Sequence, residues 1–261
     1  MKTTLIDALK RAGNIQVQSF GNSMEYSVKE SISSIVTEVD INSEKTIIEV
    51  VLSTFPNHNI LSEECGYIDN HSNYTWVIDP IDGTSNFAAG IPWFGILIAV
   101  FDSGIPIIGG AYLPVSQNLY FAEKGNGAFL NGKLLKMENQ ELSKALFAFS
   151  TDYTTDGNYL NEGVKLYKYM VQHSRNIRCT NSLVDMLYVA EGKFGGCINM
   201  FTKIWDIAFP YLLITEAGGL FKDLNLNKIV FDLNPNGMYK NYGIVAGSES
   251  IIESVKGFLG S

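Results

Sequence analysis

The pattern of apolar and polar positions predicts helices and strands that alternate along the chain. Ile47, Val50, Val51 and Phe55 recur at the spacing of one helix face, and Pro56 ends this predicted helix over 41–55. Similar reasoning predicts helices over 5–11, 158–173, 183–190, 206–217 and 248–259. Strands are predicted over 59–62, 74–78, 94–101, 105–112, 119–122, 146–150 and 243–246. Residues 14–36 are polar and serine-rich, which indicates a hairpin or a mobile loop.

The order of these elements predicts a mixed α/β (α+β) fold. Strands joined by Gly and Pro turns dominate up to Lys136, and longer helices follow it. We therefore expect two halves, 1–145 and 146–261. The first would carry most of the candidate site and the second would carry Asp206 and a substrate pocket.

The segment WVIDPIDGTSNF places two aspartates where a predicted buried strand ends. Asp79 follows the apolar residues, and Pro80 is expected to end the strand because it has no N–H for the ladder. Asp82 comes three residues after Asp79. Two carboxylates this close repel each other unless positive charge lies between them. A divalent cation would resolve the conflict; the alternative is a turn whose aspartates only cap helices.

The residues after Asp82 form a turn that opens a predicted short helix. Gly83 lets the backbone approach a ligand closely. The amides of Gly83, Thr84 and Ser85 would then be unpaired donors at a helix start, which suits an anion. One short segment thus offers both carboxylates and amide donors.

Other carboxylates also occur at the ends of predicted elements. Asp40 and Asp206 stand at helix starts, and Glu63 and Glu64 follow a strand. Each alone is explained as a helix cap or a solvated charge. Jointly they indicate a site, because the segments before three of them are apolar and a buried carboxylate needs partners. Since none of the three histidines lies in these segments, we expect oxygen ligands only, which favour Mg²⁺, Ca²⁺ or Mn²⁺ over zinc.

Composition narrows the classes of protein. With 46% hydrophobic and 18% charged residues in 261, the chain is globular rather than disordered. A net charge of −8 without a Lys/Arg cluster argues against nucleic-acid binding. The three scattered cysteines predict reduced, mostly buried thiols. Because no signal-peptide pattern and no membrane-spanning run is found, we expect a cytoplasmic protein.

Four motifs, in this order, resemble the inositol monophosphatase family, a branch of the lithium-sensitive, Mg²⁺-dependent phosphatases. TEVD (37–40) and LSEE (61–64) match the two upstream metal motifs, and WVIDPIDGTSNF (76–87) matches the first signature. WDIAFPYLLITEAGG (205–219) resembles the second signature. The resemblance covers most of the chain. It implies a layered αβαβα sandwich, usually a homodimer, that hydrolyses a small phosphorylated metabolite.

The resemblance also implies a set of metal ligands. The matching positions are Glu63, Glu64, Asp79, Ile81, Asp82, Asp206 and Asp40. A first ion would take Glu63, Asp79 and the carbonyl of Ile81, and a second would take Asp79, Asp82 and Asp206. Asp40, helped by Glu63, would hold a weaker third ion, with Glu64 supporting the ligands. Two to three Mg²⁺ ions are implied, for which Mn²⁺ can substitute.

Catalytic and substrate positions are carried over in the same way. Thr84 and Asp40, with Glu63, match the group that orients and deprotonates the attacking water. The positions that match substrate contacts are Asp82, Gly83, Thr84, Ser85, Ser182, Asn199 and Asp206. Asn199 stands where inositol-preferring members often carry a glutamate. Phe209 and Pro210 replace the usual Ala-Gly, and we expect Pro210 near the first turn of its helix.

The sequence therefore predicts a Mg²⁺-dependent phosphatase of a small polyol or sugar monophosphate, with inositol-1-phosphate as the named substrate. Alternatives within the superfamily are fructose-1,6-bisphosphatase, histidinol-phosphate phosphatase and a nucleotide 3′-phosphatase. A regulatory protein on a degenerate phosphatase scaffold is the alternative without enzyme activity. Lys29, eleven residues before Asp40, could steer phosphate from the N-terminal loop, but a solvated lysine is the favoured interpretation.

Overall fold

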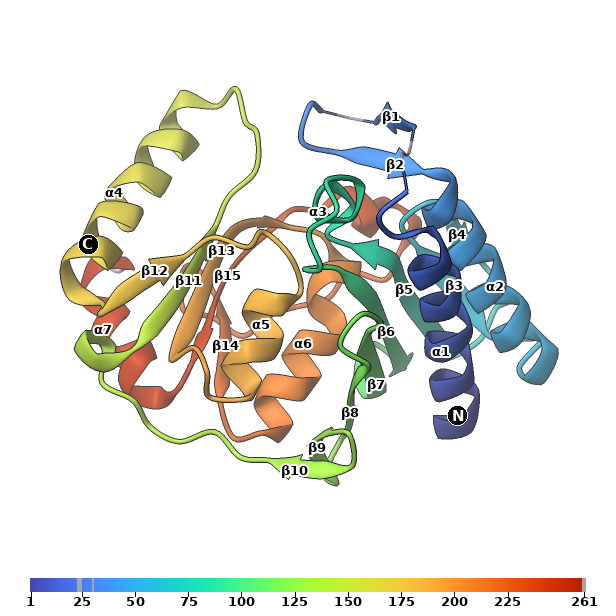
Figure 1. Ribbon diagram of the computed structural model, residues 1–261. Helices are drawn as coiled ribbons and strands as arrows, with labels where there is room; N and C mark the ends of the chain where they lie inside the picture. The colour runs from blue at the N-terminus through green and yellow to red at the C-terminus, as the bar shows by residue number, and fades with distance from the viewer. Residues whose placement is uncertain (23–24, 30, 260–261) are drawn as a thin grey trace.

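The chain folds into five layers, in which two sheets alternate with three layers of helices (Figure 1). The computed structural model describes residues 1–22, 25–29 and 31–259. The helices are α1 (Lys2–Ser19), α2 (Glu38–Thr54), α3 (Thr84–Ala88), α4 (Gly157–His173), α5 (Val184–Ala190), α6 (Ile204–Glu216) and α7 (Glu249–Leu259). Helices α1 and α2 form one outer layer, α5 and α6 lie between the sheets, and α4 and α7 form the other outer layer. The predicted αβαβα sandwich is confirmed.

The larger sheet brings two of the candidate loops to one edge. Its order is β10-β9-β8-β7-β6-β5-β3-β4. The strands are β3 (Asn59–Ser62), β4 (Gly66–Ile68), β5 (Tyr74–Asp82), β6 (Gly95–Asp102), β7 (Ile105–Leu113), β8 (Asn118–Glu123), β9 (Gly127–Leu130) and β10 (Lys133–Leu135). Strands β3 and β5 run parallel, and Ser62 pairs with Ile78. Parallel strands end at the same edge, so Glu63 and Asp79 emerge side by side.

The smaller sheet delivers the remaining aspartate. Its order is β12-β11-β13-β15-β14. The strands are β11 (Leu146–Ser150), β12 (Asn176–Arg178), β13 (Gly196–Thr202), β14 (Leu220–Asp223) and β15 (Tyr242–Gly247). Strand β13 leads into α6, which also packs against β5 to β8 of the larger sheet. One core therefore spans both sheets, and the division at residue 145 stays a prediction.

Helix α1 is longer than predicted, because the packing of the helix against the sheet outweighs the low helix propensity of Gly13. The predicted end lay at Arg11, before Gly13, but the helix continues to Ser19. A Cβ at Gly13 would lie 2.6 Å from ring atoms of Tyr112 on β7. Glycine thus lets the helix lie directly on the sheet, which offsets its cost of about 1 kcal/mol in a helix. The hairpin prediction is confirmed by β1 (Tyr26–Val28) and β2 (Ile35–Thr37), and residues 23, 24 and 30 lie outside the described part.

Two proline predictions are wrong. Strand β5 does not end at Pro80 but runs to Asp82, with a register shift between Asp79 and Asp82. At a bulge the extra residues leave the ladder, so a missing N–H costs little there. Pro210 lies inside α6, in its second turn rather than its first. There it removes the helix hydrogen bond to the carbonyl of Asp206.

Several short elements were not predicted. Strands β4, β12, β13 and β14 have seven residues or fewer and mixed composition, so their partners rather than their own pattern define them.

The thiols are also less buried than predicted, because Cys65 and Cys179 are exposed and only Cys197 is buried. Within the described residues, no helix has the length and apolar character needed to cross a membrane.

Candidate metal centre and active site

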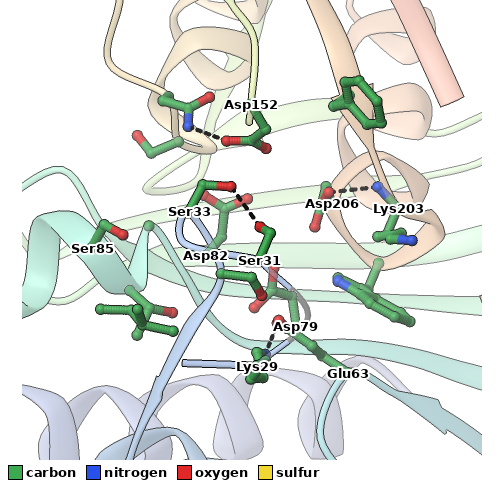
Figure 2. A pocket seen from close by; sticks show the side chains of 18 of the residues that line it. Lys29, Ser31, Ser33, Glu63, Asp79, Asp82, Ser85, Asp152, Lys203 and Asp206 are labelled. Atoms are coloured by element: carbon green, nitrogen blue, oxygen red, sulfur yellow. Dashed lines mark hydrogen bonds and ion pairs between the residues drawn. The ribbon is translucent and has the colours of Figure 1, made fainter. Parts of the chain in front are cut away.

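Three aspartates from two distant parts of the chain meet at the edge of the larger sheet (Figure 2). Asp79 and Asp82 stand on either side of the β5 bulge, and Asp206 lies in the first turn of α6. One carboxylate oxygen of each lies within 4.8 Å of the other two. The oxygen Oδ2 of Asp206 also accepts the backbone N–H of Lys203 at 2.6 Å, which fixes the carboxylate at the helix start.

Burial disfavours the ionised form of the carboxylates in this cluster. Burial, together with Glu63, raises the pKa of Asp79 well above its usual range. Burial and then Asp206 do the same to the pKa of Asp82. Burial raises the pKa of Asp206 to about 7 and that of Glu63 to about 8. Each raised pKa means that the carboxylate ionises less readily than it would in water, unless a cation lies nearby.

The donor atoms fit a hard divalent cation. The oxygen Oδ1 of Asp79 is buried and has no hydrogen-bond partner among the described residues. A buried oxygen without a donor is costly, and a metal ion would satisfy it. All side-chain donors in the cluster are carboxylate oxygens, which suit Mg²⁺ or Mn²⁺. The residues present therefore fit the metal that the sequence predicts.

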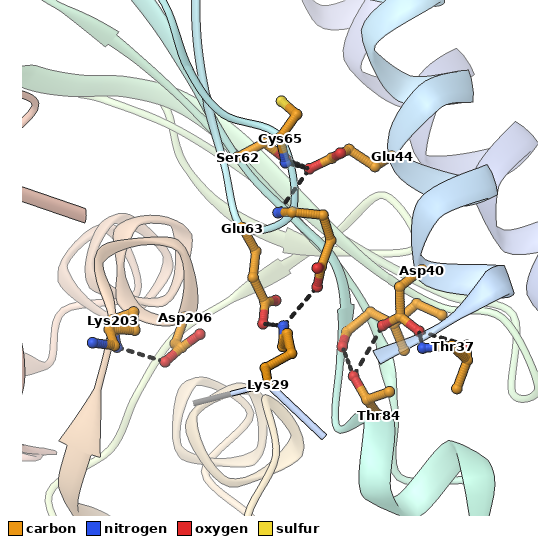
Figure 3. A network of polar contacts seen from close by, with 12 residues as sticks. Lys29, Thr37, Asp40, Glu44, Ser62, Glu63, Cys65, Thr84, Lys203 and Asp206 are labelled. Atoms are coloured by element: carbon orange, nitrogen blue, oxygen red, sulfur yellow. Dashed lines mark hydrogen bonds and ion pairs between the residues drawn. The ribbon is translucent and has the colours of Figure 1, made fainter. Parts of the chain in front are cut away.

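Lys29 supplies positive charge beside the cluster, and the expectation of a solvated lysine is wrong. Its Nζ lies 2.6 Å from Oε1 of Glu63 and 2.7 Å from Oε1 of Glu64 (Figure 3). Burial lowers the pKa of Lys29, but the two glutamates outweigh this effect and the net shift is upward. An ammonium group thus stands between two carboxylates that the sequence assigned to metal binding. A cationic group therefore already lies against both glutamates.

Thr84 and Asp40 form a hydrogen-bonded pair next to the cluster (Figure 3). The hydroxyl Oγ1 of Thr84 lies 3.0 Å from Oδ1 of Asp40 and 2.9 Å from the carbonyl of Ile81. The other oxygen, Oδ2 of Asp40, accepts the N–H and the hydroxyl of Thr37. Helix α2 therefore begins at Glu38, with Thr37 as its N-cap and Asp40 inside the first turn. The spacing Thr37-x-x-Asp40, a variant of the capping box, is a sequence signal for the contact between Thr37 and Asp40, whereas no local signal marks the contact with Thr84.

The turn after Asp82 has the predicted form. Helix α3 starts at Thr84, and Gly83 adopts a left-handed conformation with φ of 86°. A Cβ at Gly83 would lie 2.6 Å from the carbonyl oxygen of Trp93, so no other residue fits without rearrangement. The amides of Thr84 and Ser85 belong to the first turn and have no helix partner. They lie at the edge of the aspartate cluster.

Most of the predicted site residues line a cavity of about 450 Å³. The predicted residues that line it are Glu63, Asp79, Ile81, Asp82, Gly83, Thr84, Ser85, Ser182, Asn199 and Asp206. Asp40 and Glu64 do not line it. Among the residues that were not predicted, Asp152 accepts a hydrogen bond from Asn181 at 2.9 Å on the cavity wall. Neither the spacing nor the surroundings of Asp152 in the sequence marked it.

Another buried carboxylate, that of Asp185, holds the far wall of the cavity. Asp185 accepts hydrogen bonds from Ser150 at 2.7 Å and Thr180 at 2.8 Å. Burial raises the pKa of Asp185 to about 6. These bonds tie the end of β11 to the start of α5. From there the N–H of Leu183 donates to Oδ1 of Asp82, which joins this wall to the aspartate cluster.

Known proteins are similar to this chain in sequence and in fold. A fructose-1,6-bisphosphatase/inositol-1-monophosphatase of Aquifex aeolicus is 34% identical, covering 80% of each chain. The suhB extragenic suppressor of Bartonella henselae has a TM-score of 0.90 at 27% identity, covering 99% of this chain and 97% of that one. An IMPase/NADP phosphatase solved with Mg²⁺ and phosphate has a TM-score of 0.82 at 25% identity, covering 97% and 92%. The family model for the inositol monophosphatase family matches residues 1–256, and the chain belongs to that family.

Proposed function

We propose that the chain is a Mg²⁺-dependent phosphomonoesterase that acts on a small polyol or sugar monophosphate, with inositol-1-phosphate as the first candidate. The observation that carries this proposal is the convergence of Asp79, Asp82 and Asp206, with Oδ1 of Asp79 buried and unpaired. Beside these acids lie free amides and a threonine hydroxyl. Membership of a phosphatase family supports the same reaction class.

The carboxylates divide between two main metal positions. Glu63, Asp79 and the carbonyl of Ile81 would hold one ion, and Asp79, Asp82 and Asp206 a second. Bound Mg²⁺ would neutralise the phosphoryl oxygens and lower the pKa of the attacking water. The relative solved with Mg²⁺ and phosphate supports this cofactor. A third ion at Asp40 would have to compete with hydrogen bonds that both of its oxygens already accept.

Thr84 and Asp40 would handle the proton of the attacking water. Oγ1 of Thr84 accepts a proton from the water while its own proton passes to Oδ1 of Asp40, 3.0 Å away. Burial raises the pKa of Asp40, which suits a proton acceptor. The N–H and hydroxyl of Thr37 hold Asp40 in this orientation. The amides of Gly83, Thr84 and Ser85 would bind the phosphate oxygens.

Replacing Thr84 by valine tests this relay. Valine keeps the shape but has no hydroxyl, so we expect kcat to fall about 100-fold or more, the usual contribution of general acid–base catalysis. The Kd for Mg²⁺ should stay unchanged, because Thr84 is not among the proposed ligands. Thr84→Ser restores the hydroxyl and should recover most of the activity. Steady-state kinetics with calorimetric Mg²⁺ titration measures both quantities, and equal kcat for Thr84→Val and wild type would exclude the relay.

The substrate pocket favours a polar leaving group. Asn199 and Ser182 line the cavity next to the aspartates. The carbonyl oxygen of the Asn199 side chain already accepts the N–H of Phe201 at 3.0 Å, which leaves its NH₂ as a donor to a substrate oxygen. A polyol or sugar hydroxyl or a second phosphate would accept from this group. Inositol-1-phosphate and fructose-1,6-bisphosphate are therefore the two substrates to compare first.

A phosphate-release assay tests the proposed function directly. Purified protein would be given inositol-1-phosphate, fructose-1,6-bisphosphate, histidinol phosphate and phosphoadenosine phosphate, with Mg²⁺ or with EDTA. We expect Mg²⁺-dependent release, fastest with inositol-1-phosphate, and inhibition by lithium. Binding of Mg²⁺ without release from any substrate would favour a regulatory protein instead. A homodimer in the cytoplasm remains part of the proposal.

A further inference from the structure

Glu44 lies next to the candidate metal centre and was not singled out by its sequence. It is a buried residue of α2, one turn after Asp40. Its oxygen Oε1 accepts three hydrogen bonds, all from the segment that carries Glu63 and Glu64 (Figure 3). The donors are the hydroxyl of Ser62, the N–H of Glu64 at 3.0 Å and the N–H of Cys65 at 3.1 Å.

These bonds fix the backbone on both sides of Glu63. Ser62 ends β3, and its ladder partner is Ile78, directly before Asp79. The N–H of Glu63 donates to the carbonyl of Ile78 at 3.3 Å, a long bond that ties the segment only to the neighbouring strand. Glu44 adds a tie to a different layer, helix α2. The segment therefore has few ways to turn its two glutamate side chains relative to the aspartates.

A buried carboxylate at position 44 costs more free energy than a neutral side chain would. Its presence is therefore explained only if the position of the Ser62–Cys65 segment matters. Glu44 adds a buried negative charge close to Glu64 and contributes to raising the pKa of that glutamate. A neutral side chain would close the same space without repelling its acidic neighbours. A carboxylate oxygen, however, accepts several N–H and O–H donors at once and makes stronger bonds than a neutral acceptor. Glu44 thus holds the segment in a defined position, although its charge repels the neighbouring glutamate.

We propose that Glu44 is a positioning residue that orients Glu63 and Glu64 toward the divalent cation. The inference rests on the proposed function, because it presupposes that Glu63 binds the ion. Lys29 holds the carboxylate ends of these glutamates, and Glu44 holds their backbone ends. An ion that takes Oε1 of Glu63 displaces Lys29 from that oxygen. Glu44 is then the main restraint on the direction of both side chains.

Four variants separate position from charge and from fold stability. Glu44→Gln keeps an oxygen at the same place and loses the charge. Glu44→Asp keeps the charge but withdraws the oxygen by one methylene. Glu44→Ala removes both. Ile47→Ala opens a cavity in the same buried face of α2 and removes none of the hydrogen bonds to Ser62, Glu64 and Cys65. Each metal-free variant is titrated with Mn²⁺ by calorimetry, and its Tm is recorded.

We expect the Kd for Mn²⁺ to rise about 10- to 100-fold in Glu44→Ala and Glu44→Asp, the usual effect of losing a partner of a metal ligand. In Glu44→Gln we expect a smaller rise than in these two variants, because an acceptor oxygen remains in place although a neutral oxygen binds its three donors less strongly. Ile47→Ala should lower Tm and leave Kd unchanged. If Glu44→Ala does not fold, the comparison of Gln with Asp carries the test.

Two results would overturn the inference while leaving the function intact. One is a wild-type Kd in Glu44→Asp; the other is a rise in Ile47→Ala as large as that in the Glu44 variants, which would make the effect one of general destabilisation. If the wild-type protein itself binds no Mn²⁺, the proposed function fails, which is a distinct outcome.

Discussion

Asp82→Asn is expected to abolish phosphatase activity while the protein becomes more stable without metal. Asparagine keeps the oxygen that accepts the N–H of Leu183, so the local structure should persist. It removes one of three carboxylates that lie within 4.8 Å of one another, and with it a shared metal charge. Loss of an outer partner of a ligand already costs about 10- to 100-fold, so loss of the ligand should cost more than about 100-fold in kcat/KM.

The same substitution should raise the Tm of the metal-free protein. Asp82 is buried beside Asp206, and burial and this neighbour raise its pKa well above the usual range. Removing a carboxylate that resists ionising relieves repulsion in the folded state. Asp7→Asn is the control, because Asp7 pairs with Arg11 on the exposed face of α1, and its loss should change neither activity nor Tm appreciably. Normal turnover in Asp82→Asn would refute the metal assignment.

Without metal, the protein should lose stability as the pH rises from 5 to 8. The pKa of Glu63 is about 8 and that of Asp206 about 7, whereas both lie near 4 in an unfolded chain. Between about pH 4 and pH 8 the folded chain therefore holds protons that the unfolded chain has released. Stability falls with pH wherever the folded state binds more protons. We expect Tm to fall by roughly 5–10 °C across this interval.

Divalent ions should reverse most of this loss. Calorimetric scans of EDTA-treated protein at pH 5, 6, 7 and 8, each repeated with Mg²⁺, would show the largest Mg²⁺ effect at pH 8. Asp185, whose pKa is raised to about 6, contributes a smaller slope that Mg²⁺ should leave in place, because it binds Ser150 and Thr180 instead. Asp206→Asn should flatten the pH dependence, whereas Asp7→Asn should not. A Tm that stays level or rises from pH 5 to 8 would contradict the electrostatics of the site.

Local signals were sufficient for the elements that carry the candidate chemistry. Apolar runs before Glu63 and Asp79 marked strands β3 and β5, and the glycine after Asp82 marked the turn into α3. The start of α6 was placed to within two residues. These signals work because a strand end, a turn and a helix start depend on a few neighbouring residues. Short edge strands such as β12 and β14 were missed because their partners, not their composition, stabilise them.

The sequence by itself determined the kind of site, namely clustered carboxylates, no histidine, and a glycine turn with free amides. Only the tertiary structure decided which groups meet. It placed Lys29 between Glu63 and Glu64, turned Asp40 toward Thr84, and set Glu44 behind the glutamate segment. The physical reason is the distance along the chain over which each kind of interaction acts. Residue type and spacing specify local hydrogen bonding, whereas the partner of a buried charge is chosen by the packing of layers that lie far apart in the chain.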